Sequence, residues 1–234
     1  MNPCNLDKVI QCISESRLVG YQGNKILSSA ELLDDYVLTI KQNQILYPAF
    51  HILEIILRNK IHFAIEEIFS TKEWILEYFY YKNPSIVKNF SGLKKESKED
   101  FDKQIKSSYN EATKKIGEKK NRSLIEGDLI AGLTFGFWTT LLGRPFSNAL
   151  GDKGLFIKVF GEFKFSKIGT KEFTREEAEI RYKINEIRKD RNRAFYHEKI
   201  HHFERAEELI WEMIKLISTD SYIYFYNIFH RNFL

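Results

Sequence analysis

The chain has 234 residues, of which 43% are apolar and 29% are charged, and this composition is ordinary for a soluble globular protein. That length is enough for one well-buried domain or at most two small ones. The net charge of +4 is too small to indicate nucleic-acid binding by itself, and the longest uncharged run, residues 129–143, is shorter than the roughly 20 residues of a membrane-spanning helix.

The amino-terminal end leads into a charged amphipathic stretch rather than an apolar core, so we expect no signal peptide. The two cysteines, Cys4 and Cys12, would lie about 12 Å apart on a helix, which is too far for a disulfide. We therefore expect a cytoplasmic protein that contacts no membrane. With only 12 Gly and 4 Pro, the composition also favours helices.

Two helices are predicted in the first third of the chain. Ser28 and Glu31 form a capping box ahead of apolar residues at helical spacing in residues 32–40. A stronger helix is predicted over about residues 48–69. One narrow polar face of this second helix carries three residues at intervals of four. They either form an internal salt bridge that braces a core helix or flank a functional site; they are Glu54, Arg58 and His62.

Residues 94–122 are basic, with ten Lys and Arg against six Asp and Glu. Ser97 and Asp100 predict a cap, and the apolar residues that follow recur at helical spacing. A solvated face is one interpretation of this amphipathic helix, and a surface that contacts an RNA backbone is the other. The residues that would form its basic end are Lys114, Lys115, Lys119, Lys120 and Arg122.

Residues 129–142 are almost entirely apolar and predict a helix, or a pair of helices, buried on every side. Gly132 and Gly136 would let neighbouring backbones approach closely. Residues 153–169 alternate like a strand but lie alone between helical patterns, so we expect an irregular segment or a short helix there.

The last third again predicts helices. Thr174, with Glu177 as its capping partner, would open a long helix, and apolar residues from 209 to 217 mark the next one. The aromatic residues of 221–234 are expected to pack in the core or against a partner rather than stack on bases. Because no repeat or linker is visible, residues 1–234 are expected to form one all-α domain.

One charged residue interrupts the apolar stripe of that long helix. The stripe follows Ile180, Ile184 and Ile187, and the next step of four reaches Arg191. A charge at a position that faces a packed surface is costly unless it is paired. We expect either a buried ion pair, with Glu54 or Glu198 as the partner, or an arginine held in a half-buried cleft for an anionic substrate.

Arg191 opens the segment RNRAFYHE, which places a histidine, His197, six residues further on. On a straight helix these two side chains face different directions, whereas Arg193 and His197 share a face. Arg191 and His197 would cooperate only if the helix breaks between them or if two copies meet in a dimer. An arginine and an imidazole suit metal-free RNA cleavage, because the first stabilises a phosphorane and the second moves a proton.

Arg191, Asn192 and His197 resemble the R-x(4–6)-H motif of the HEPN superfamily of ribonucleases, in which a polar residue follows the arginine. The full segment is similar to the Abi-like branch, which is associated with abortive phage infection. Residues 53–61 (LEIILRNKI) resemble the E-x-x-x-R helix of that branch, and residues 128–142 resemble its "fGFW" segment. The similarity covers about residues 30–205. Tyr196 stands where the branch often has another histidine.

The resemblance implies an all-α bundle of HEPN type, a homodimer with its cleft at the interface, and RNA cleavage by 2′-OH attack without metal or cofactor. It implies that Arg191 and His197 are catalytic. Transfer RNA is a candidate substrate, and a cognate antitoxin, protein or RNA, a candidate partner of such a toxin or phage-defence effector. The supporting residues would be Asn192, Arg193, Tyr196, Glu198, Glu54 and Arg58, and the RNA-binding residues Lys114, Lys115, Lys119, Lys120, Arg188 and Lys189.

Two other functions stay open on the sequence. The segment HEKIH, which begins at His197 and ends at His201, matches the zinc-peptidase motif H-E-x-x-H, which requires both histidines on one helical face. Its Lys199 would place a cation near the metal, and a third ligand has no independent support. We therefore expect no metal site. The other alternative is a HEPN-like module that binds RNA or nucleotides without catalysis.

Overall fold

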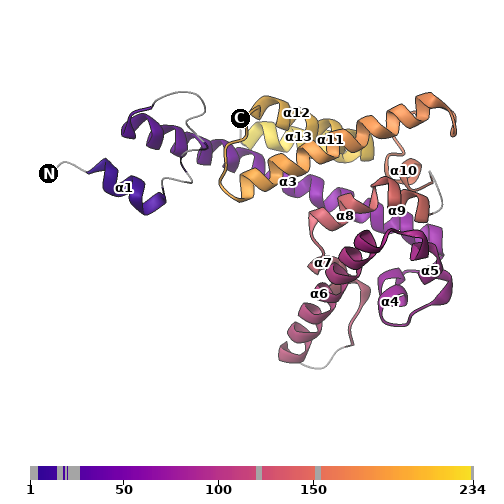
Figure 1. Ribbon diagram of the computed structural model, residues 1–234. Coiled ribbons are helices and arrows are strands. Elements are labelled where there is room, and N and C mark those ends of the chain that lie inside the picture. The colour runs from indigo at the N-terminus through magenta and orange to yellow at the C-terminus, as the bar shows by residue number, and fades with distance from the viewer. Residues whose placement is uncertain are drawn as a thin grey trace.

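Every regular element in the described part of the chain is helical, which confirms the all-α prediction (Figure 1). The computed structural model describes residues 5–14, 18, 20, 27–119, 123–150 and 154–232. The elements are α1 (Leu6–Ile13), α3 (Ser29–Phe69), α4 (Trp74–Phe79), α5 (Pro84–Asn89), the 3₁₀ helix η1 (Phe90–Gly92), α6 (Lys95–Lys119), α7 (Glu126–Gly132), α8 (Phe135–Leu141), α9 (Arg144–Ala149), α10 (Gly154–Val159), α11 (Lys171–Phe195), α12 (Phe203–Ile217) and α13 (Thr219–Asn232).

The long helix α3 is the element on which the others are arranged. Its predicted capping box is confirmed, since the Ser28 hydroxyl accepts from the Glu31 amide and the Glu31 carboxylate accepts from the Ser28 amide. The prediction of two separate helices was wrong, because Pro48 lies inside one continuous helix of 41 residues. A proline in a helix interior costs about 3 kcal/mol. Burial of Leu46, Ala49 and Phe50 around it holds the helix together.

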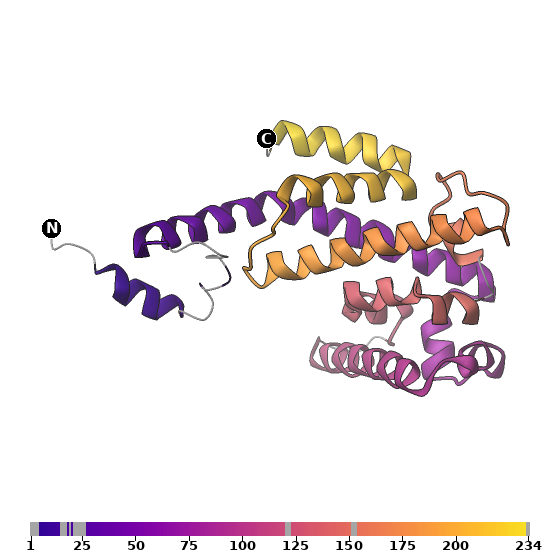
Figure 2. The same cartoon turned by 45° about the horizontal axis from the view of Figure 1, so that its top comes forward.

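The helices pack around α3 in layers, in an order that two views share (Figures 1 and 2). Helices α8, α10, α11 and α12 contact α3 directly, and α13 packs mainly on α12. Helices α6 and α7 lie on the side of α3 opposite to α12 and α13. Helix α1 lies beside the N-terminal end of α3, away from the rest, in a small cluster formed by Ile10, Leu18 and Leu32.

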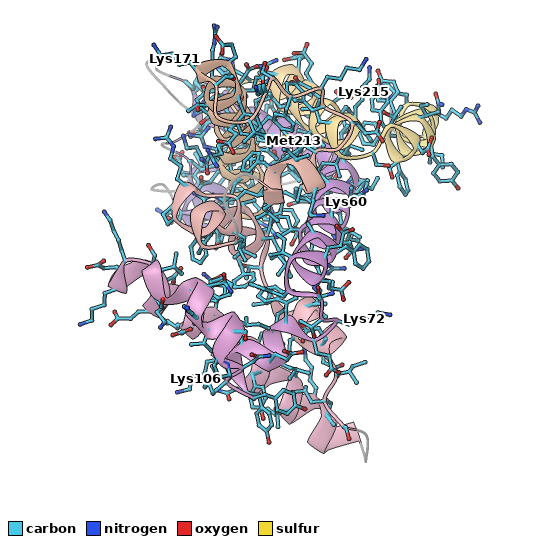
Figure 3. All side chains as sticks on the ribbon, turned by 90° about the vertical axis from the view of Figure 1, so that its right-hand side faces the viewer. Lys60, Lys72, Lys106, Lys171, Met213 and Lys215 are labelled. Atoms are coloured by element: carbon cyan, nitrogen blue, oxygen red, sulfur yellow. The ribbon has the colours of Figure 1, made fainter. Side chains whose placement is uncertain are left out.

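A single large apolar cluster connects helices from α3 to α13. Met213 of α12 is completely buried in it, and Figure 3 shows this residue among the helices. All the lysines labelled in the same view are exposed; they are Lys60, Lys72, Lys106, Lys171 and Lys215. None of the described helices combines the length and the apolar composition needed to cross a bilayer.

Two predicted helix starts were wrong by a few residues. Helix α6 begins at Lys95, so Ser97 lies inside the helix instead of capping it. Helix α11 begins one turn earlier than expected, because Thr170 accepts from the amide of Phe173 at 3.2 Å and takes the role predicted for Thr174. Both threonines are suitable caps. Capping at Thr170 is favoured because the helix then includes the buried Phe173.

The apolar segment after residue 128 forms the pair α7–α8, with Thr134 capping α8 through the amide of Phe137 at 3.2 Å. The expectation of burial on every side was too broad, because Ala131, Gly132 and Thr134 are exposed. Gly132 does allow the close approach that we expected, since a Cβ there would lie 2.4 Å from Ser108 Oγ. Gly136 does not, because a Cβ there would make ordinary contacts.

The remaining fold predictions concern the segment after α9 and the aromatic tail. Helix α10 followed by irregular structure matches the expectation for residues 153–169, within the part that begins at Gly154. In α13, Phe229 is buried, and Tyr222, Phe225 and Tyr226 pack against the core. Cys12 is an exposed free cysteine, whereas Cys4 lies outside the described residues.

A buried polar network joins α3, α4 and α7. Glu126, the first residue of α7, accepts from the amides of Ile75 and Leu76 at 2.8 and 3.1 Å and so caps α4. His62 Nδ1 accepts from Trp74 Nε1 at 3.0 Å, which places the ring proton on Nε2, 3.1 Å from Glu66. His62 therefore braces the fold. Burial raises the pKa of Glu126 to about 7, despite these two amide hydrogen bonds.

The raised pKa of Glu126 predicts a pH dependence of stability. The pKa of the Glu126 carboxyl is higher in the folded state than in the unfolded state, so its protonated form stabilises the fold. This contribution to the unfolding free energy is fully present below about pH 4.5 and is lost as the pH rises through about 7. The unfolding free energy of the wild type, relative to that of Glu126→Gln, should therefore fall by roughly 2–3 kcal/mol between these pH values. Denaturant unfolding of both proteins across pH 4.5–7.5 measures this; a constant difference contradicts the prediction.

Candidate functional site

The candidate site lies at the C-terminal end of α11, against the middle of α3. Ile180, Ile184 and Ile187 are buried as predicted, and Arg191 continues their stripe with its side chain 24% exposed. Its Nη2 lies 3.2 Å from Glu54 Oε2, so the partner is Glu54 and not Glu198, which is exposed. A half-buried ion pair therefore joins the two long helices.

Two further contacts hold the guanidinium of Arg191. Its Cζ lies 4.0 Å from the centroid of the Phe195 ring, which is a cation–π distance. Its Nη1 lies 3.4 Å from Oδ1 of the exposed Asn192. The buried Nε–H has no acceptor among the described residues. These contacts fix the orientation of the guanidinium, and each Nη group uses one of its two N–H bonds in them.

On α3, the three polar residues predicted to stack on one face have different roles. Glu54 binds across to α11, as described above. Arg58 Nε donates to Asn59 Oδ1 at 3.2 Å, and the hydrogen bonds of His62 lie in the core. Of the three residues, Glu54 therefore lies beside the candidate site, whereas Arg58 and His62 make their hydrogen bonds further along α3.

The helix ends between Arg191 and His197. A helix break at this place is one of the two arrangements that would allow these residues to cooperate. Helix α11 stops at Phe195, and His197 has a left-handed backbone with φ of 58°. The His197 amide donates to the Ala194 carbonyl at 3.1 Å, and the Glu198 amide donates to the Arg193 carbonyl at 2.7 Å. These two bonds form a Schellman motif with histidine at the position where glycine is usual.

This break corrects the expectation that Arg193 and His197 share a helical face, because His197 lies beyond the helix. Arg193 instead lies 3.7 Å from Asp190. Burial raises the pKa of Asp190, although the charges of Arg193, His201 and His202 oppose that shift. Tyr196 and His197 are exposed at the turn.

The segment after the helix end is fastened to α3. Tyr47 Oη donates to the Ala194 carbonyl at 2.8 Å, and its ring meets the Phe195 ring edge-on at 5.0 Å. Asn43 Nδ2 donates to the Glu198 carbonyl at 3.1 Å. Lys199 Nζ lies 2.7 Å from Asp35. The turn that carries His197 therefore has a defined position on α3.

The HEKIH segment does not have the geometry of a zinc-peptidase helix. It lies in the turn and loop between α11 and α12, so His197 and His201 are not one helical turn apart on a common face. Within the described ranges, no group of three or more His, Cys, Asp or Glu side chains is placed to hold a metal ion. Glu212, a carboxylate on the following helix α12, pairs with Lys183 at 2.7 Å.

The predicted RNA-binding residues do not form one patch. Lys114 and Lys115 are exposed on α6, which lies across α8 from α11, and Lys115 pairs with Glu111. The side chain of Lys119, with Lys120 and Arg122, falls outside the described residues. Arg188 and Lys189 lie on α11 itself, and Lys189 pairs with Glu186 at 2.7 Å.

His51 is a residue near the candidate site that was not predicted from the sequence. At 100° per residue, Tyr47, His51 and Glu54 lie within about 60° of one another on α3. This is the face that contacts the end of α11, and His51 is exposed on it. The spacing was visible in the sequence, but only the contacts of Tyr47 and Glu54 show that this face meets the motif.

Comparisons with models of known families, with curated proteins and with solved structures found no match. The candidate site therefore rests on its own geometry.

The left-handed backbone of His197 predicts a stability difference between two variants. A β-carbon in this conformation costs about 1 kcal/mol, and glycine relieves that cost. Both His197→Gly and His197→Ala remove the imidazole and any contact it makes. The glycine variant should therefore be about 1 kcal/mol more stable than the alanine variant in denaturant unfolding. Equal stability, or greater stability of the alanine variant, would show that the turn is not left-handed in solution.

The Arg191–Glu54 pair predicts a measurable coupling energy. A double-mutant cycle with Arg191→Ala and Glu54→Ala should give about 1–2 kcal/mol, because both side chains are mostly buried. The matched control is the exposed pair Arg205–Glu208, whose side chains are 56% and 68% exposed and whose coupling should be about 0.5 kcal/mol or less. Similar values for the two cycles would contradict the geometry.

Proposed function

We propose that this protein is a metal-independent endoribonuclease of HEPN type in the Abi-like branch, acting as a homodimer. The observation that carries the proposal is the arrangement of Arg191 and His197. The arginine is held by Glu54 and Phe195 at the end of a helix. The histidine is exposed on a fixed turn directly after it.

Each residue in this arrangement suits one task in attack of a 2′-OH on the adjacent phosphate. The imidazole of His197 would act as general acid or base. The guanidinium of Arg191 would stabilise the non-bridging oxygens, because hydrogen bonds from a fixed cation strengthen as negative charge develops there. Asn192, beside the guanidinium, would orient the phosphate. The products would be a 2′,3′-cyclic phosphate and a 5′-OH.

The partners of the proposed enzyme would be a second copy of the chain, an RNA and an antitoxin. In a two-fold homodimer, two copies of the motif would line one cleft. Structured RNA with exposed loops, such as transfer RNA, would be the substrate, because its unstacked nucleotides leave the 2′-OH accessible. Basic residues on α6 and α11 would contact its backbone. A toxin or phage-defence effector of this kind, acting in the cytoplasm, would be restrained by an antitoxin of protein or RNA.

The experiment is cleavage of end-labelled transfer RNA in EDTA. We expect the wild type to cut, and both His197→Ala and Arg191→Ala to lose at least a hundredfold in rate, because each removes one half of the proposed chemistry. Gel analysis of product ends should show the cyclic phosphate. The matched control is His201→Ala, which removes a neighbouring exposed imidazole and should retain activity.

Three outcomes would contradict the proposal. Cleavage that survives in His197→Ala would assign the chemistry to another residue. Activity that EDTA abolishes and zinc restores, with loss in His201→Ala, would indicate a metalloenzyme. RNA or nucleotide binding without any cleavage, and without sensitivity to His197→Ala, would indicate a non-catalytic binding module.

A further inference from the structure

A pocket of about 240 Å³ lies on α11, on the N-terminal side of the candidate site. Helices α8 and α9 form its other main wall, and α6 contributes Ser97 to the lining. This volume is below the roughly 300–1,000 Å³ of pockets for whole small-molecule ligands, so it suits a single chemical group. The polar side chains that α11 contributes are Arg181, Asn185 and Arg188.

The pocket carries a positive charge that the described residues only partly neutralise. Arg181 Nη1 lies 3.5 Å from Glu177, and its Nε donates to the Leu142 carbonyl at 2.8 Å. Arg188 forms no ion pair with any residue in the described ranges. Arg144, at the start of α9, adds a further positive charge near Arg181. An anionic group is therefore the complementary ligand.

Arg181 is held rigidly as one wall of the pocket. Its side chain is 14% exposed, and its Cζ lies 4.4 Å from the centroid of the Phe156 ring. Burial lowers the pKa of Arg181, and the charge of Arg144 acts in the same direction. Arg188 is half-buried, and Asn185 is exposed. One fixed guanidinium and one unpaired guanidinium together suit the oxygens of a phosphate.

The pocket and Asn192 of the candidate site lie on one face of α11. At 100° per residue, Arg181, Asn185, Arg188 and Asn192 fall within about 60° of one another. Arg181 and Asn192 are eleven residues apart, which is about 16 Å along the axis at 1.5 Å per residue. A single strand of a few nucleotides covers this distance. Its scissile phosphate would lie beside Asn192 and another phosphate in the pocket.

We propose that this pocket is a phosphate subsite, in which Arg188 and Arg181 bind a phosphodiester of the RNA strand a few nucleotides away from the bond that is cut. Its place in the substrate path rests on the proposed function. Arg188 lines the pocket and would bind this phosphate, whereas the adjacent Lys189 pairs with Glu186 and does not line the pocket.

The first test measures binding of a 5′-fluorescein-labelled RNA octamer by anisotropy in EDTA, with His197→Ala as the background. Adding Arg188→Ala should weaken binding at least fivefold and reduce the slope of log affinity against log salt by about 0.7, the value for one phosphate contact on a single strand. Lys215→Ala, which removes one exposed positive charge from α12, a helix that does not line the pocket, is the matched control and should change affinity less than twofold. Asn185→Asp, which places a negative charge at an exposed position in the pocket, should also weaken binding.

The second test separates the subsite from catalysis. A dinucleotide has only the scissile phosphate, so Arg188→Ala should change its cleavage less than twofold while lowering kcat/KM for the octamer at least fivefold. If the wild type cuts neither RNA but Arg188→Ala weakens octamer binding, the subsite stands and the proposed function fails. If cleavage is observed and Arg188→Ala affects both substrates equally, or neither, the subsite proposal is wrong.

A free nucleotide is the other source of the same phosphate chemistry. Binding of AMP to the same variants, measured by calorimetry, distinguishes it from an RNA strand. Loss of AMP binding in Arg188→Ala, with unchanged octamer binding, would assign the pocket to a free nucleotide and overturn the proposal. If Arg188→Ala weakens binding of the octamer more than binding of AMP, the pocket binds an RNA strand.

Discussion

The pairing of Arg191 with Glu54 fixes the relation between α11 and α3, the two helices that carry the candidate site. Arg191 takes a position that the apolar stripe of α11 would otherwise fill with an aliphatic residue. Because a charge there must be paired, Glu54 has to face it from the middle of α3. The Phe195 ring and the Asn192 side chain also contact the guanidinium and limit its movement. A rigid, half-buried cation at a helix end is the result.

The end of α11 places the imidazole of His197 on the turn that follows Arg191. The Schellman motif stops the helix at Phe195 and directs the chain over α3, where Tyr47 and Asn43 bind it through its carbonyl groups. His197 occupies the strained position of that motif. Backbone strain at a non-glycine residue is frequent at functional sites, because the surrounding structure must stabilise it. The polar face that continues along α11 towards Arg188 offers a path for an extended anionic ligand.

Features that depend on local chemistry could be predicted from the sequence, whereas those that depend on packing could not. The Ser28–Glu31 capping box and the misfit of Arg191 in its stripe are local, and both predictions were confirmed. The continuity of α3 through Pro48 depends on burial around it, and the choice of Thr170 over Thr174 depends on Phe173. Both were therefore predicted wrongly.

In the candidate site, too, the features that depend on packing could not be predicted from the sequence. Glu54 was one of two carboxylates that the sequence offered as the partner of Arg191, and only the packing of α11 on α3 selects it. No local rule predicts a left-handed histidine, since glycine or asparagine is usual there. The pocket beside Arg188 requires residues of α8 and α9, far away in sequence.

The most direct test of the central claim is a crystal structure of the protein bound to an RNA that carries a 2′-deoxy substitution at the site of cleavage, which prevents the 2′-OH attack. We predict that Arg191 and His197, from one chain or from two chains of a dimer, both lie within hydrogen-bonding distance of the same phosphate. A complex in which the RNA contacts other surfaces, or in which the two side chains reach different phosphates, would contradict the account.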